Sequence, residues 1–128
     1  MNASFQDCSV LNKLIFKYGG SWKNVFDGFS RSHVRNGHAI ADMAIENYIE
    51  MRDLVNDPIY KKRRELELLL EAKFSERFIP RYSMVSFHQI PYAEVYRRGE
   101  IQFKLMNQYL SNELTETKLH ELIKQQLT

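Results

Sequence analysis

The chain has little of several features that would assign it to a well-defined class of protein. Its 128 residues include one cysteine, Cys8, so an internal disulfide is excluded and the thiol fits a reducing compartment. No apolar run approaches the roughly 20 residues of a membrane-spanning helix, and residues 1–6 lack the basic and apolar regions of a signal peptide. We therefore expect a soluble, cytoplasmic protein with no membrane partner.

Motifs for metal, nucleophilic or phosphate chemistry are also missing. The four histidines stand at no helical ligand spacing with a carboxylate or a thiol, and neither Gly-x-Gly-x-x-Gly nor a Walker lysine motif occurs. A formal net charge of +2 does not indicate nucleic acid, and the basic run at 61–64 precedes glutamates that can pair with it along a solvated helix face. The sequence therefore predicts no metal site, no catalytic residue and no nucleic-acid partner.

What the sequence does contain is helical periodicity. Apolar residues recur at spacings of three and four, and a hydrophobic content of 44% is ordinary for one globular domain or a part of one. Helices are expected over 2–17, 22–36, 38–55, 58–77, 91–109 and 118–127, with Asn36-Gly37 separating the second from the third. Residues 82–87 alternate in polarity and predict a short extended segment. The fold class is mostly α, with five or six helices and one short extended segment.

One polar residue interrupts the apolar stripe of the helix expected over 38–55. Asn47 lies between Met43 and Met51 on that face, and Glu50 follows one turn later. A buried amide without a hydrogen-bond partner costs about 1–3 kcal/mol, so Asn47 needs a partner if the stripe is covered. Periodicity alone leaves two interpretations open: an amide that caps or bridges neighbouring helices, or a polar anchor in a ligand pocket.

Several stretches resemble one enzyme family. Residues 1–8, Met-Asn-Ala-Ser-Phe-Gln-Asp-Cys, are similar to the Met-Asn-Ala-Gly-Phe-Glu-Asp-Cys segment of the kynurenine 3-monooxygenases, which are flavin-dependent aromatic hydroxylases. Ser4 and Gln6 depart from that pattern. Further stretches are similar, in order and spacing, to the C-terminal third of the family: Ala41-Asp42, Asn47-Tyr48-Ile49-Glu50-Met51-Arg52, residues 78–87 and Tyr92-Ala93-Glu94. The resemblance covers 1–110 as a helical, substrate-side region, whereas 111–128 form an unmatched C-terminal helix.

This resemblance implies a specific chemistry and specific residues. In the family, reduced FAD, supplied with hydride by NADPH, activates O2 to hydroxylate the aromatic ring of L-kynurenine to 3-hydroxykynurenine. By position, Asn47 and Tyr82 match residues that hydrogen-bond the amino-acid end of kynurenine. Glu50 and Met51 match their neighbours in the substrate pocket. The resemblance therefore favours the ligand-anchor interpretation of Asn47.

The same resemblance implies that a large part of the enzyme lies elsewhere. Met1 and Asn2 match the turn at a helix N-terminus whose backbone amides approach the flavin ring, but the preceding glycine-rich segment and the dinucleotide-binding unit are missing from this sequence. Because the first helix begins almost at residue 1, we expect a C-terminal fragment that binds neither FAD nor NADPH and is inactive alone. Its expected partners are a separate N-terminal flavin-binding half and, once assembled, L-kynurenine. The alternative is a small helical protein-interaction module, without catalytic activity, that self-associates.

Overall fold

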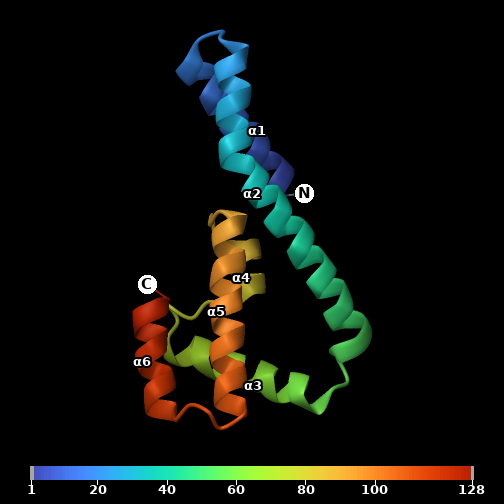
Figure 1. Cartoon of the computed structure of the whole chain (residues 1–128), viewed down its shortest axis with the longest axis vertical. Coiled ribbons are helices and arrows are strands. Elements are labelled where there is room, and N and C mark those ends of the chain that lie inside the picture. Colours follow the sequence, from blue (N-terminus) through green and yellow to red (C-terminus); the bar gives the residue numbers. More distant parts are fainter. Residues whose placement is uncertain (1, 128) are drawn as a thin grey trace.

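The computed structural model describes residues 2–127, and over this range it consists of helices joined by turns (Figure 1). The mostly α fold predicted from the sequence is confirmed. Within the described range, no helix combines the length and the apolar character needed to cross a membrane. The elements are α1 (Asn2–Tyr18), α2 (Trp22–Ile49), the π-helical segment η1 (Glu50–Leu54), α3 (Pro58–Lys73), α4 (Arg81–Phe87), α5 (Tyr92–Leu110) and α6 (Glu116–Gln126).

The first two helices form a hairpin at one end of the molecule (Figure 1). Gly19 and Gly20 make its turn with φ values of +47° and +84°, a backbone region that glycine enters without steric cost, so the predicted end of the first helix is confirmed. Val25 is buried in the hairpin, whereas Phe16 and Trp22 are 81% and 56% exposed. Two helices alone cannot cover their own apolar side chains, so the hairpin presents an apolar surface.

The main core lies at the other end of the molecule, where α3, α5 and α6 meet. Phe78, in the loop after α3, is fully buried and packs with side chains from all three helices. The fourth predicted helix ends earlier than expected, at Lys73, which frees the following residues to carry Phe78 into this core. The buried members of the cluster are Leu70, Phe78, Leu105, Met106, Leu119, Ile123 and Leu127.

The predicted break at residues 36–37 is wrong, because α2 runs through it without interruption. Gly37 has an ordinary helical backbone rather than the left-handed conformation of a helix stop. The Asn36 side chain instead accepts a hydrogen bond from the backbone N–H of Ala93, at 3.0 Å, in the first turn of α5. Asn36 therefore acts as a helix cap for a segment far away in the sequence, because Pro91 at the N-cap position of α5 provides no side-chain cap.

The extended segment predicted at 82–87 is also wrong, because these residues belong to the short helix α4. Pro80, with φ −53° and ψ 144°, is the N-cap residue, and its carbonyl accepts the first helical hydrogen bond from Met84 N–H at 2.9 Å. The Met84 side chain is fully buried, and α4 packs against α5. Tertiary packing thus overrides a polarity alternation that is too short to specify a strand.

Replacing Asn36 with alanine should lower the free energy of unfolding by about 1 kcal/mol, because α5 loses the acceptor at its N-terminus. Urea unfolding followed by circular dichroism measures the change. Asn24→Ala, at an exposed position of the same helix, serves as the control and should have a smaller effect. Equal losses for the two variants would show that the contact with Ala93 does not stabilise the fold.

Candidate functional site

Three of the four residues predicted to contact a substrate lie around the point where α2 becomes π-helical. The backbone N–H of Glu50 is shared between the carbonyls of Glu46 and Asn47, and the wider turn of η1 follows immediately. Single π-helical turns within helices are frequent at functional sites, because they redirect side chains from their regular positions. Asn47, Glu50 and Met51 all lie within two residues of this transition.

Asn47 and Met51 lie on the outer face of the α2–η1 junction. Asn47 is exposed, Met51 and Tyr48 are each 60% exposed, and within residues 2–127 the Asn47 side-chain amide has no hydrogen-bond partner. Of the two interpretations that periodicity leaves open for Asn47, the structure therefore does not support a bridge between helices within residues 2–127. The physical reason is that α2 packs toward α5 with the face that carries Ala39 and Glu46, which leaves Asn47, Tyr48 and Met51 in solvent, whereas Ile40 and Met43 are half-buried.

Tyr82 occupies the first turn of α4 and is 70% exposed. Its ring meets Phe87 edge-on with 6.4 Å between the ring centroids, and its hydroxyl has no hydrogen-bond partner among the described residues. Like Asn47, it therefore presents an unused polar group beside exposed apolar side chains. Apolar side chains with few polar groups match the composition of a small-molecule site, but neither Asn47 nor Tyr82 lines the cavity described below.

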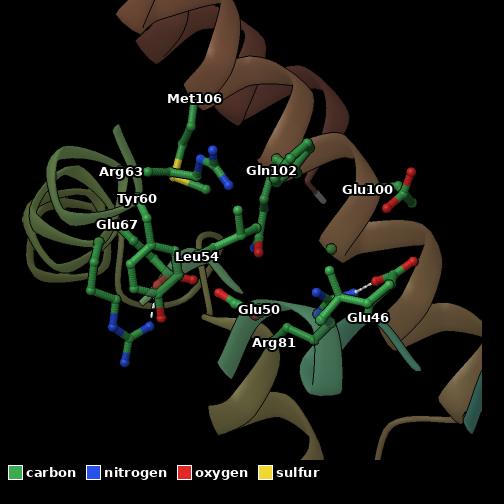
Figure 2. Close-up of a pocket in the computed structure, with 14 residues that line it drawn as sticks. Glu46, Glu50, Leu54, Tyr60, Arg63, Glu67, Arg81, Glu100, Gln102 and Met106 are labelled. Atoms are coloured by element: carbon green, nitrogen blue, oxygen red, sulfur yellow. Dashed lines mark hydrogen bonds and ion pairs between the residues drawn. The ribbon is translucent and has the colours of Figure 1, made fainter. Parts of the chain in front are cut away.

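A carboxylate connects the helices that carry Asn47 and Tyr82. Glu46, which precedes Asn47, accepts a hydrogen bond from the guanidinium of Arg81, which precedes Tyr82 (Figure 2). It also accepts one from the Tyr96 hydroxyl at 2.9 Å. The hydrogen bond to the Glu46 carboxylate raises the pKa of Tyr96. Because the side chains of Glu46 and Arg81 meet, the C-terminal part of α2 and the start of α4 lie close together.

Beside this connection lies a cavity of about 390 Å³ between the end of α2, α3 and α5 (Figure 2). Of the four predicted substrate contacts, Glu50 lines this cavity, whereas Asn47, Met51 and Tyr82 are not among its lining residues. Its remaining wall combines charged and apolar side chains: Glu46, Ile49, Leu54, Tyr60, Arg63, Arg64, Glu67, Arg81, Gly99, Glu100, Gln102, Phe103 and Met106.

The charges of this cavity are mostly paired within the chain. Burial raises the pKa of Glu67, although its ion pair with Arg64 acts in the opposite direction. Burial and, next, the negative charge of Glu50 raise the pKa of Tyr60. The Arg63 guanidinium stacks over the Phe103 ring, 4.5 Å from its centroid. Both signs of charge are therefore represented in the cavity wall, by four carboxylates and three guanidinium groups.

Sequence reasoning missed Glu46, Tyr96 and the role of Arg81. Glu46 and Tyr96 are fifty positions apart and become neighbours only through the packing of α2 on α5. One signal was present in the sequence: Gly99 interrupts an otherwise helix-forming stretch, at a cost of about 1 kcal/mol relative to alanine. A Cβ atom at Gly99 would lie 3.1 Å from Cδ of Arg81, so the glycine marks where that side chain crosses α5.

The predicted cofactor contacts are Met1 and Asn2. Met1 lies outside the described residues, and Asn2 is the first residue of α1, whose first turn contains no acidic residue. A helix N-terminus favours negative charge, but FAD also needs a phosphate-binding turn after a strand, which this sequence lacks. The residues present therefore do not fit a complete flavin site. Among the described residues, no group of three or more His, Cys, Asp or Glu side chains could hold a metal ion.

The chain is similar to proteins named kynurenine 3-monooxygenase. It is 44% identical over 101 residues to the protein of Myxococcus xanthus (strain DK1622). The aligned segment covers 79% of this chain and 22% of that relative. It is 36% identical over 115 residues to the protein of Caenorhabditis elegans, covering 90% of this chain and 25% of that relative. The protein of Stenotrophomonas maltophilia (strain K279a) is 42% identical over 102 residues, covering 80% and 22% respectively.

These relatives are much longer than the chain described here. The chain spans about a quarter of the length of the curated relatives that it matches. No sequence profile of a known protein family matches it.

Proposed function

Because the chain belongs to the kynurenine 3-monooxygenase family, of which it matches the C-terminal part, we propose that it forms one wall of a kynurenine-binding pocket. In this proposal, Asn47 and Tyr82 hold the amino-acid end of L-kynurenine, and Glu50 and Met51 are their neighbours in the pocket. The rest of the pocket comes from a flavin-binding part of the enzyme that this sequence does not contain.

The observation that carries the proposal is the state of the Asn47 amide and the Tyr82 hydroxyl. Both groups are exposed, and within residues 2–127 neither has a hydrogen-bond partner. An exposed polar group is satisfied by water, but the same group needs a new partner once another part of the enzyme covers it. A bound amino acid, with its carboxylate and ammonium groups, would supply that partner.

The chemistry of the two side chains suits the two charges of an amino acid. The Asn47 amide can donate to a carboxylate through its nitrogen and accept from an ammonium through its oxygen, while the Tyr82 hydroxyl can donate to the carboxylate. Hydrogen bonds with an ionised partner are shorter and stronger than those between neutral groups. Two such side chains on different helices would therefore orient the substrate as well as bind it.

The apolar side chains beside these groups suit the aromatic part of the same substrate. Tyr48 and Met51 share the outer face of the α2–η1 junction with Asn47, and the Arg52 guanidinium stacks on the Tyr48 ring, 5.1 Å from its centroid. Burying this face against an aromatic ring would contribute about 25 cal/mol for each Å² of apolar surface removed from water. In the intact enzyme, FAD, with NADPH as its reductant, would supply the oxygen chemistry, while these residues bind the substrate and exclude water.

Reconstitution tests this proposal. The chain is combined with the N-terminal part of the Myxococcus xanthus enzyme that precedes the matched segment, and NADPH oxidation is followed with and without L-kynurenine. We expect kynurenine-dependent oxidation and 3-hydroxykynurenine from the mixture, and neither from the chain alone. Turnover by the chain alone would contradict the proposal, as would a stable complex of the two parts that binds FAD but does not respond to L-kynurenine.

The apolar surface of the α1–α2 hairpin favours a second candidate, a helical interaction module that pairs with itself. Phe5, Phe16, Trp22 and Phe26 are each more than half exposed. This candidate predicts that the chain forms a concentration-dependent dimer, which persists when the N-terminal part of the Myxococcus xanthus enzyme is added. It also predicts that the mixture does not bind FAD. Sedimentation velocity on the same mixture distinguishes the two candidates, because a one-to-one complex excludes the self-association model.

A further inference from the structure

A carboxylate side chain joins three helices next to the proposed substrate contacts. One oxygen of Glu46, in α2, accepts a hydrogen bond from the Tyr96 hydroxyl of α5 at 2.9 Å. The other oxygen accepts from the Arg81 guanidinium at the start of α4. Both oxygens are therefore occupied, each by a donor from a different helix. This arrangement holds α4 and α5 to a single point on α2.

The position of this connection in the sequence gives it a consequence for the site. Glu46 directly precedes Asn47, and Arg81 directly precedes Tyr82. Both α2 and α4 pack against α5, so the Glu46–Arg81 ion pair is a direct connection between two helices that otherwise share a common neighbour. Because each substrate contact is one residue from the ion pair, the pair limits how far Asn47 and Tyr82 can move apart.

Because the Glu46–Arg81 ion pair is partly buried, its electrostatic attraction is stronger than that of a pair on an open surface. The side chains of Arg81 and Glu46 are 29% and 35% exposed, so their interaction is screened less than that of exposed pairs. The Arg81 aliphatic chain crosses α5 at Gly99, which is buried. A methyl group there would lie 3.1 Å from Cδ of Arg81, so the side chain would have to shift by a few tenths of an ångström.

We propose that Glu46 is a positioning residue for the substrate: by holding Arg81 and Tyr96 at once, it sets the separation of the Asn47 amide and the Tyr82 hydroxyl. This inference rests on the proposed function, because it assigns Glu46 a role in orienting the amino-acid end of L-kynurenine. Glu46 does not itself touch the substrate in this proposal. It acts through the placement of the two residues that do.

The first arm of the test measures the geometry in the full 128-residue chain, without any substrate. Cys8, which is exposed, is replaced by serine, and nitroxide labels are attached to cysteines introduced at positions 47 and 82. Electron–electron double resonance then gives the distribution of distances between the labels. We expect a narrow distribution when Glu46 is present and a broader one after Glu46→Gln, with Glu121→Gln on α6 as the matched control.

The second arm measures the KM for L-kynurenine in the reconstituted enzyme, in which Asn47 and Tyr82 are left unchanged. Glu46→Gln should raise the KM for L-kynurenine on the order of tenfold or more, because small misplacements of binding groups have large effects. Gly99→Ala, which leaves every charge in place, should act in the same direction. The double variant Glu46→Arg with Arg81→Glu reverses the pair and should recover part of the lost affinity. A merely structural role of Glu46 predicts less folded complex, and therefore a lower apparent kcat, with an unchanged KM.

The outcomes of the two arms separate this inference from the proposed function. A broadened distribution with a raised KM, both partly reversed by the charge exchange, supports Glu46 as a positioning residue. An unchanged distribution after Glu46→Gln overturns it, whether or not the enzyme turns over. A broadened distribution with an unchanged KM overturns its role toward the substrate. If the unmodified mixture never responds to L-kynurenine, the proposed function fails, and the substrate role of Glu46 fails with it.

Discussion

Replacing Phe78 with alanine is expected to lower the free energy of unfolding by about 3–5 kcal/mol. Phe78 is fully buried where α3, α5 and α6 meet, and its backbone N–H donates to the Phe74 carbonyl at 2.8 Å. Removing the ring from this cluster takes away its apolar burial and leaves a cavity that the surrounding helices can fill only in part. Domains typically have a total stability of about 5–15 kcal/mol, so the loss is a large fraction of what is available.

Equilibrium unfolding in urea, followed by circular dichroism, measures this effect. Phe16→Ala is the matched control, because the same side chain is 81% exposed in α1 and its removal should change stability by less than about 0.5 kcal/mol. Similar losses for the two variants would mean that Phe78 is not in the core of the folded chain. That result would contradict the described packing of α3, α5 and α6.

The second large effect concerns the two proposed substrate contacts in the reconstituted enzyme. Asn47→Leu and Tyr82→Phe should each weaken L-kynurenine binding by roughly tenfold to a hundredfold, because a hydrogen bond to a charged group contributes about 1.5–3 kcal/mol. Since both side chains would bind the same end of the substrate, the two losses should not be additive in the double variant. The stability of the chain itself should hardly change, because both side chains are exposed.

Isothermal titration of the reconstituted complex with L-kynurenine gives the four affinities of this double-mutant cycle. Asn24→Leu on α2 and Tyr109→Phe at the end of α5 are the controls, because they make the same chemical changes far from the proposed site. Unchanged affinity in the Asn47 and Tyr82 variants would exclude these residues from the pocket. Additive losses of affinity in the double variant would indicate that Asn47 and Tyr82 bind different groups of the substrate.

The helices could be predicted where local signals and local structure coincide. The glycine pair after α1 requires positive φ, and Pro58 at the start of α3 follows the N-cap Asp57, whose carboxylate accepts from the Ile59 N–H at 2.8 Å. Each of these signals serves the element next to it. The sequence therefore predicts both boundaries correctly.

The failures occur where a local signal serves a distant partner. Asn36 has the chemistry of a helix terminus, but it caps α5, 57 positions further on, while its own helix continues. Residues 82–87 alternate in polarity like a strand, but they form a helix in which the Met84 side chain is buried. No property of these six residues alone predicts that burial. In both cases a contact between helices decides the structure, and periodicity does not record such contacts.

The candidate site divides in the same way. Asn47 and Tyr82 were found through resemblance to a family, since no spacing rule relates residues so far apart in the sequence. The Glu46–Arg81–Tyr96 connection depends on three helices packing together, so it becomes visible only in the structure. Gly99 carries a partial signal, because a glycine in a helix costs stability relative to alanine, but Gly37 in α2 has no close neighbour, so only the structure shows which of the two marks a close approach.

The central claim is that the Asn47 amide contacts the amino-acid end of L-kynurenine, and nuclear magnetic resonance tests it most directly. The chain is labelled with ¹⁵N, assembled with the unlabelled N-terminal part, and titrated with L-kynurenine. We predict that the side-chain NH2 signals of Asn47 shift and saturate with the substrate, while those of Asn24 stay in place. Unchanged Asn47 signals in a complex that binds and hydroxylates L-kynurenine would contradict the claim.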